Sequence, residues 1–328
     1  MPANFLIGLT AGLIAAVVFV SATTGPLAMR VLLFLLTPLS LFLAGLGWSW
    51  TAALIGGIAG TLALALATTP GIGMVFAIAH AIPVAILSYL VTLNRPAAGP
   101  GPDTDPATRL EWYPVGRIVI WAAAISGAMA LAAMVMIGPD IETLKATVRK
   151  LIDEVFKAQI EAVNGGKQLG EEELAKLTDV GLYLLPAATA LSWMSTILLN
   201  LWLAGRITAA SGKLQRPWPD IAAMRFPRLA PAVLALSTAA TFLTGYPALA
   251  AAAISGAFYF AYVLMGLAVI HYITRGQPWR PFVLWALYGA LFILNTGVSL
   301  VIAILGLADS FIAIRKPQQP HGGPGPPV

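Results

Sequence analysis

The stretch NFLIGLTAGLIAAVVFVS, from Asn4 to Ser21, decides the fold class because it is apolar almost throughout and carries no charge. A helix that spans a membrane needs roughly 20 consecutive apolar residues. No basic residue precedes this run, and more apolar sequence follows it at once. We therefore interpret it as a retained first span rather than as a cleavable signal peptide.

The composition of the whole chain agrees with a protein that faces lipid. Of its 328 residues, 59% are hydrophobic and only 10% are charged, whereas a soluble domain has about 25% charged residues. The net charge of +5 comes from basic residues in short loops between apolar runs, where they act as topology signals, so we expect no nucleic-acid partner. The chain has no cysteine, which excludes disulfides, thiolate metal sites and cysteine nucleophiles.

Apolar runs of spanning length recur along the chain and predict an all-α fold. We expect a polytopic transmembrane helix bundle of about ten spans (nine or ten), with an extracytoplasmic amphipathic helical insert. Residues 281–313 are too long for one ordinary span and short for two, but Asn295-Thr296-Gly297 reads as a tight turn, which favours two short, tilted helices. The predicted spans are 4–21, 26–46, 50–68, 72–93, 118–137, 180–203, 230–245, 248–271, 281–295 and 297–313.

Two segments rich in proline and glycine divide the chain. Residues 94–117 are predicted to be a flexible cytoplasmic linker, and residues 317–328 a disordered tail. The linker separates a four-helix membrane block, 1–93, from a second membrane block, 118–316, and the tail follows the second block. We find no repeat of fixed period.

The insert at 138–179 has a different pattern. Apolar residues recur at helical spacing over 140–163, with charged residues mostly on the other face, so an amphipathic helix is expected there. It would end at Asn164-Gly165-Gly166, and a short acidic helix from Glu171 would lead into the sixth span. The amphipathic helix could be a lid over an outward-facing pocket, a helix in the plane of the interface, or a soluble hairpin packed on the bundle; we favour the interface.

The distribution of lysine and arginine predicts that both termini lie inside a bacterial inner membrane. Six basic residues fall in the outer segment, and Arg30 lies within the second span. The inner loops hold 12 of the 19 basic residues, namely Arg95, Arg109, Arg117, Arg206, Lys213, Arg216, Arg225, Arg228, Arg275, Arg280, Arg315 and Lys316.

Polar residues inside apolar runs are costly and therefore mark candidate sites. The candidates for substrate binding are Arg30, His80, Asn200 and Asn295. Each also has an ordinary structural explanation. Arg30 would extend to the interface instead of binding an anionic head group, and His80 would be a buried histidine satisfied by a neighbouring helix instead of a proton relay. Asn200 and Asn295 would form interhelical hydrogen bonds instead of lining a cavity.

No catalytic residue, metal site or cofactor is predicted. The sequence contains no Walker A, HExxH or GxSxG motif, and Glu171-Glu172-Glu173 is better explained as the charged start of a solvated helix. His271 and Tyr272 are expected at the inner interface. Asp309 is the only acidic residue within a predicted span, and its position six residues before Arg315 places it at a helix end.

Small residues on the first span point to close helix packing. Gly8 and Gly12 form one small-xxx-small pair, and Ala11 and Ala15 form another; Gly56 and Gly60 form a similar pair on the third span. Internal packing explains them by default. The alternative is that Gly8, Ala11, Gly12 and Ala15 dock another membrane protein.

The C-terminal half resembles the YybS-like family of multi-pass bacterial membrane proteins, whose function is unknown. The residues that carry the resemblance are apolar motifs within the predicted spans. They are Leu185-Pro186-Ala187, Leu199-Asn200-Leu201-Trp202-Leu203-Ala204, the run from Tyr262 to His271, and the run from Leu305 to Ser310.

That family is distantly similar to the substrate-binding S components of energy-coupling-factor transporters and to the cell-shape protein MreD. The resemblance implies a bundle with a cavity near the outer leaflet and a transmembrane partner docked at Ala11 and Ala15, although S components have about six spans rather than ten. The function we expect is transport-related binding of a small molecule or membrane lipid, without an ATPase of the chain's own. A non-transporting envelope scaffold is the alternative. A lipid-modifying enzyme would require Arg30, His80 and Asp309 to meet.

Overall fold

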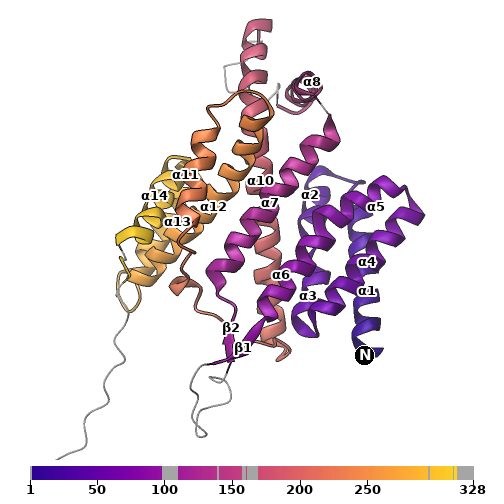
Figure 1. The fold of residues 1–328 in the computed structure, drawn as a ribbon, viewed down its shortest axis with the longest axis vertical. Coiled ribbons are helices and arrows are strands. Elements are labelled where there is room, and N and C mark those ends of the chain that lie inside the picture. The colour runs from indigo at the N-terminus through magenta and orange to yellow at the C-terminus, as the bar shows by residue number, and fades with distance from the viewer. Residues whose placement is uncertain are drawn as a thin grey trace, which may run out of the picture.

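The computed structural model describes residues 2–97, 110–138, 140–156, 160, 169–294, 296–312 and 314–315. Its helices run up and down between two ends (Figure 1). The end that carries the N-terminus and the β1–β2 hairpin is called the basal end here, and the end that carries α8 the apical end. The predictions for Asn295 and for the tail, 317–328, concern residues outside the described ones.

Helices dominate the described chain, which confirms the all-α fold class. The first block contains α1 (Pro2–Ser21), α2 (Leu27–Leu36), α3 (Leu39–Gly47), α4 (Trp50–Ala67), α5 (Pro70–Phe76), the π-helical turn η1 (Ala77–Ala81) and α6 (Ile82–Thr92). The second contains α7 (Val115–Ile137), α8 (Ile141–Leu151), the π-helical turn η3 (Ile152–Phe156), α10 (Glu171–Ala210), the 3₁₀ turn η4 (Ile221–Ala223), α11 (Ala230–Ala240), α12 (Tyr246–Ile273), α13 (Arg280–Leu294) and α14 (Thr296–Ile312).

Each of the ten predicted spans is helical, although two of them consist of successive helical segments, and the spans differ in length. Among the described residues, seven stretches are long and apolar enough to cross a membrane. The other three, α11, α13 and α14, have 11, 15 and 17 residues. At 1.5 Å per residue they extend about 16 to 26 Å, less than the roughly 30 Å of a hydrocarbon core. Two helices, α13 and α14, cover most of the region 281–313 as predicted, but Thr296 and Gly297, which were expected in a turn, belong to the first turn of α14.

Pro38 divides the second span. The proline has no N–H to donate within the helix, so α2 ends at Leu36 and α3 begins at Leu39. The backbone N–H of Thr37 donates to the carbonyl of Phe34 at 3.3 Å, which tightens the last turn of α2. The predicted span 26–46 is therefore two helices in succession.

The linker predicted as flexible is ordered at both of its ends. β1 (Asn94–Pro96) pairs antiparallel with β2 (Leu110–Trp112), and an ion pair of 2.8 Å joins Arg95 to Glu111 across them. The flexibility prediction missed this pairing because proline and glycine dominate the composition of the segment. Residues 98–109 lie outside the described residues.

α10 corrects the expectation of a separate short acidic helix. The acidic residues from Glu171 and the sixth span form one continuous helix of 40 residues. Its first turn is capped by the Glu173 carboxylate, which accepts a hydrogen bond of 2.9 Å from the backbone N–H of Gly170. In Figure 1 this helix extends beyond its neighbours at the apical end.

α8 lies across the apical end of the bundle (Figure 1). Its apolar side, Leu144 and Val148, is buried in a cluster with Leu174 and Leu182 of α10. Lys145 of α8 also forms an ion pair of 2.5 Å with Asp179 of α10. The apolar face of the insert thus packs against protein, which is the hairpin alternative, rather than facing lipid.

The small residues of α1 pack against α4. A Cβ at Gly12 would lie 2.1 Å from the carbonyl oxygen of Gly56, and a Cβ at Gly8 would lie 2.6 Å from that of Ala52. Ala15 is fully buried. Close approach of these two helices requires the small residues, as the default explanation expects.

Candidate functional site

A cavity of about 870 Å³ opens among the basal ends of the helices. It is called the basal cavity here. Ligand sites in proteins have volumes of roughly 300 to 1,000 Å³. Its lining comes from α3, α6, α7, α10, α12, α13 and the segment between α10 and α11, and comprises Leu46, Val91, Val115, Ile118, Val119, Leu198, Leu201, Trp202, Gly205, Leu214, Arg216, Trp218, Pro219, Asp220, Ile221, Ala222, Met224, Leu264, Leu267, Ala268, His271, Arg275, Arg280 and Tyr288.

The walls of the basal cavity are apolar, whereas its charged lining is cationic. Leu198 and Leu201 of α10 lie on one side, and Leu264 and Leu267 of α12 on another. Among the described residues that line it, the formal charges are those of three arginines, Arg216, Arg275 and Arg280, and one aspartate, Asp220. With histidine neutral, three positive and one negative charge leave an excess of two positive charges.

Arg216 is held at the basal cavity by weak contacts. Its guanidinium donates to the carbonyls of Val91 and Tyr113 at 3.3 and 3.4 Å and lies 5.8 Å from the Trp112 ring centroid. Its Nε is buried and has no hydrogen-bond partner among the described residues. Burial lowers the pKa of Arg216, because removal from water disfavours the charged form of the guanidinium.

The other two arginines differ in their partners. Arg275 forms a two-pronged ion pair with Asp220, one arm of which is 2.7 Å long. This contact lowers the pKa of Asp220 and raises that of Arg275, since each charge stabilises the other. Arg280 instead contacts a ring nitrogen of His271 at 3.5 Å, and the other ring nitrogen of His271 lies 2.8 Å from the Tyr288 hydroxyl.

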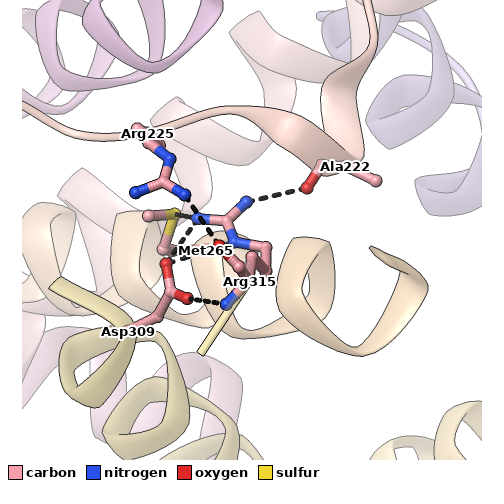
Figure 2. Close-up of polar contacts among 5 residues, drawn as sticks. All are labelled: Ala222, Arg225, Met265, Asp309 and Arg315. Atoms are coloured by element: carbon pink, nitrogen blue, oxygen red, sulfur yellow. Dashed lines mark hydrogen bonds and ion pairs between the residues drawn. The ribbon is translucent and has the colours of Figure 1, made fainter. Parts of the chain in front are cut away.

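A buried ion pair holds one segment of the basal-cavity lining in place. Arg315 pairs with Asp309 at 2.6 Å, and its Nη1 donates to the carbonyl of Ala222 at 2.7 Å (Figure 2). Arg225 in turn donates to the backbone carbonyl of Arg315 at 2.9 Å. These contacts tie the end of α14 to the 221–225 segment, whose Ile221, Ala222 and Met224 line the cavity.

The cavity-lining segment is also held by a glycine contact. A Cβ at Gly116 would lie 1.9 Å from the carbonyl oxygen of Arg225. Only a residue without a Cβ permits α7 to approach the segment so closely. The segment therefore has a fixed position between α7 and α14.

His80 lies apart from the basal cavity and has an unusual environment. It is fully buried, and its ring contacts those of Phe19, Phe34 and Phe76 at centroid distances of 5.5 to 5.7 Å. Neither ring nitrogen has a hydrogen-bond partner among the described residues. The expected hydrogen bond to a neighbouring helix is replaced there by three aromatic rings, and a proton-relay role stays a prediction.

Asn200 and Arg30 are not among the residues that line the basal cavity. Asn200 on α10 is buried and donates to the carbonyl of Leu35 at 2.6 Å, which is the interhelical hydrogen bond of its structural explanation. Arg30 is exposed, and its Nε donates to the carbonyl of Ala22 at 3.3 Å beyond the end of α1. Anion binding by Arg30 stays a prediction.

The three residues that a lipid-modifying enzyme would need do not meet. Asp309 is enclosed with Arg315 beside α12, His80 is enclosed by the rings of α1, α2 and α5, and Arg30 is exposed on α2. Among the described residues, no group of three or more His, Asp or Glu side chains has a metal-binding arrangement.

Sequence reasoning missed the cluster that the fold assembles. Arg216, Arg275 and Arg280 had been treated only as topology signals, and His271 as an interfacial residue. His271 and Arg280 are only nine positions apart, with Arg275 between them, whereas Arg216 comes from the segment after α10, so no local spacing connects it to them. The available signal was the stretch Arg216-Pro217-Trp218-Pro219-Asp220, which places one arginine, one tryptophan and one aspartate close together.

Residues 107–310 match the family model described as "Predicted membrane protein (DUF2232)". The match covers more than half of the 328 residues and most of the basal-cavity lining. No curated protein and no solved structure matches the chain.

Proposed function

This chain belongs to the family described as "Predicted membrane protein (DUF2232)", and we propose that it is a transport-related membrane protein that binds a lipid or small molecule in the basal cavity. The cavity is the observation that carries the proposal. Its volume suits a ligand, and its apolar walls with a few polar groups are typical of binding sites.

The charge distribution supports a cytoplasmic position for the basal end. The segments after α10 and after α12, which lie there, contain Lys213, Arg216, Arg225, Arg228, Arg275 and Arg280. Arginine and lysine concentrate on the cytoplasmic side of membrane proteins. This distribution supports the proposal that both termini lie inside a bacterial inner membrane, with α8 on the outer side. The basal cavity would then lie toward the cytoplasm, whereas the resemblance implied a cavity near the outer leaflet.

Movement of a ligand would rely on a partner or on rocking of one helix group against another. The sequence carries no nucleotide-binding motif that would make the chain its own motor. α10 packs against α3 in one block and against α7 and α12 in the other, so a shift along α10 would change the basal cavity. The resemblance to the YybS-like family, and through it to S components, supports a transport-related role.

An envelope scaffold is the second candidate, and α13 favours it. In the described structure α13 has no buried residue, and Phe282, Trp285 and Phe292 are 71%, 77% and 90% exposed. Exposed aromatic and aliphatic side chains of this kind face either lipid or a partner helix. A scaffold would be recovered with a bound membrane protein and an empty basal cavity.

Native mass spectrometry of the chain, extracted gently with its lipids, tests the proposal. A stoichiometric ligand is expected on the wild type and on Leu284→Trp, a variant of α13 outside the cavity lining. Leu267→Trp adds the same bulk inside the basal cavity and is expected to lose the ligand. A wild-type chain that carries no ligand, with or without a bound partner, would refute the binding function.

A further inference from the structure

We propose that the basal cavity binds a lipid that carries a phosphate group, with the phosphate held by Arg216, Arg275 and Arg280 and a hydrocarbon chain along the apolar walls. This inference rests on the proposed binding function and specifies its ligand class. The lining of this one cavity contains both cationic side chains for the phosphate and apolar side chains for the hydrocarbon chain.

The positive charge at the basal cavity lacks enough acidic partners. Among the described residues, Asp220 is the only carboxylate in the lining, and it is paired with Arg275. In the described part of the chain, the buried Nε of Arg216 has no hydrogen-bond partner. The side chain of Arg280 contacts a ring nitrogen of His271 at 3.5 Å, and no carboxylate of the described residues pairs with it. Partly buried cations that lack acidic partners are costly, and an anionic ligand would reduce that cost.

The geometry of arginine suits phosphate, as it suits carboxylate. Its guanidinium donates two parallel hydrogen bonds to two oxygens of one phosphate. Arg275 already makes this two-pronged contact with the Asp220 carboxylate. Because both partners are partly exposed, at 35% and 47% of their side-chain surface, their pair is weak and a phosphate can replace the carboxylate.

The apolar walls favour a lipid over a free anion. Beyond the arginines, leucines of α10 and α12 line the cavity, and Trp202 and Trp218 lie among them. Inorganic phosphate would leave these side chains in contact with water, whereas a hydrocarbon chain would cover them. Tryptophan is also common where a bilayer meets water, which is the depth at which a lipid phosphate lies.

Binding of matched lipids to the purified full-length chain tests the inference. Phosphatidic acid and diacylglycerol with identical chains differ only in the phosphate, and inorganic phosphate supplies the headgroup chemistry alone. Native mass spectrometry in a neutral detergent measures occupancy of each lipid at increasing concentration. Added inorganic phosphate, at millimolar concentration, is tested for its ability to displace phosphatidic acid.

The arginines are tested with a matched surface control. Arg280→Gln and Arg216→Gln are expected to weaken phosphatidic-acid binding by about tenfold each, because each loses a charged hydrogen bond. Arg228→Gln removes an exposed arginine from the same basal end, outside the cavity lining, and is expected to bind as the wild type does. If Arg216→Gln fails to fold, Arg280→Gln still decides the test. Among the described contacts, the side chain of Arg280 makes no hydrogen bond to the backbone, so its loss should not disturb the fold.

The outcomes separate this inference from the proposed function. Retention of phosphatidic acid but not diacylglycerol, with losses only in the cavity variants, supports the phosphate-lipid site. Equal binding of both lipids would overturn the phosphate assignment and leave lipid binding intact. Displacement of phosphatidic acid by inorganic phosphate would identify a free-anion site and overturn the lipid assignment. An absence of all ligands, on freshly extracted protein too, would refute the binding function itself.

Discussion

Asp309 and Arg315 form an ion pair of 2.6 Å whose side chains are only 1% and 2% exposed (Figure 2). The pair lies six residues apart at the end of α14, and Arg315 continues the connection to the Ala222 carbonyl. The guanidinium of Arg315 also contacts the sulfur of Met265 on α12 at 3.5 Å. Two buried charges therefore connect α14, α12 and the cavity-lining segment at one point.

Asp309→Ala is expected to destabilise the chain strongly. Removal of one partner leaves the Arg315 guanidinium buried without its counter-ion, which costs roughly 3–5 kcal/mol. Thermal unfolding of the purified variant, followed by loss of monodisperse protein, measures the effect. The double variant Asp309→Ala/Arg315→Met is expected to recover part of the lost stability, because it removes both charges.

An exposed ion pair provides the control for this prediction. Arg95 and Glu111 are 74% and 53% exposed, so Arg95→Gln should change stability by no more than about 1 kcal/mol. If Asp309→Ala were as mild as Arg95→Gln, the buried pair would not be a structural connection. The 221–225 segment would then need another explanation for its position.

The spans were predictable because apolar length and helical hydrogen bonding leave few alternatives in a membrane. The division of 281–313 into two helices, α13 and α14, was predictable from the turn-forming residues Asn295-Thr296-Gly297. Asp309 was correctly placed at a helix end before Arg315. In each case the information is local in the sequence.

The basal cavity was not predictable for the opposite reason. Arg216 lies far in sequence from His271 and Arg280, and it joins them in one cavity only when the segment after α10 packs near α12 and α13. The continuity of α10 was missed because acidic residues at a helix start resemble a separate soluble helix. His80 was expected to have a hydrogen bond, since sequence does not reveal that three phenylalanines surround it.

Gly12→Ala is expected to destabilise the bundle, although alanine ordinarily favours a helix over glycine by about 0.5–1 kcal/mol. The added Cβ would lie 2.1 Å from the Gly56 carbonyl oxygen, so α1 and α4 must separate. Gly289→Ala on α13 is the matched control, because a Cβ there has no neighbour within 4 Å. Thermal unfolding should show a lower midpoint for Gly12→Ala and an unchanged or higher one for Gly289→Ala. Equal midpoints would contradict the close packing of α1 on α4.

The two faces of α1 allow packing and docking to be separated. Ala15 is fully buried, so Ala15→Leu should destabilise the chain itself and is a poor test of a partner. Val17 is 65% exposed, and Val17→Trp should leave the chain stable because lipid accommodates a large apolar side chain. Loss of a co-purified membrane protein from Val17→Trp, at normal stability, would support docking on α1. Retention of the same partner would place docking elsewhere.

Asp220→Asn is expected to tighten the binding of phosphatidic acid several-fold. The Asp220 carboxylate competes for the guanidinium of Arg275, and an amide cannot hold that cation as strongly. Arg275 would then be free to contact the phosphate together with Arg216 and Arg280. Titration in native mass spectrometry measures the change, and Asp153→Asn, which alters an exposed ion pair of the apical insert, should leave binding unchanged. Weaker binding by Asp220→Asn would show that the carboxylate positions Arg275 for the ligand instead of competing with it.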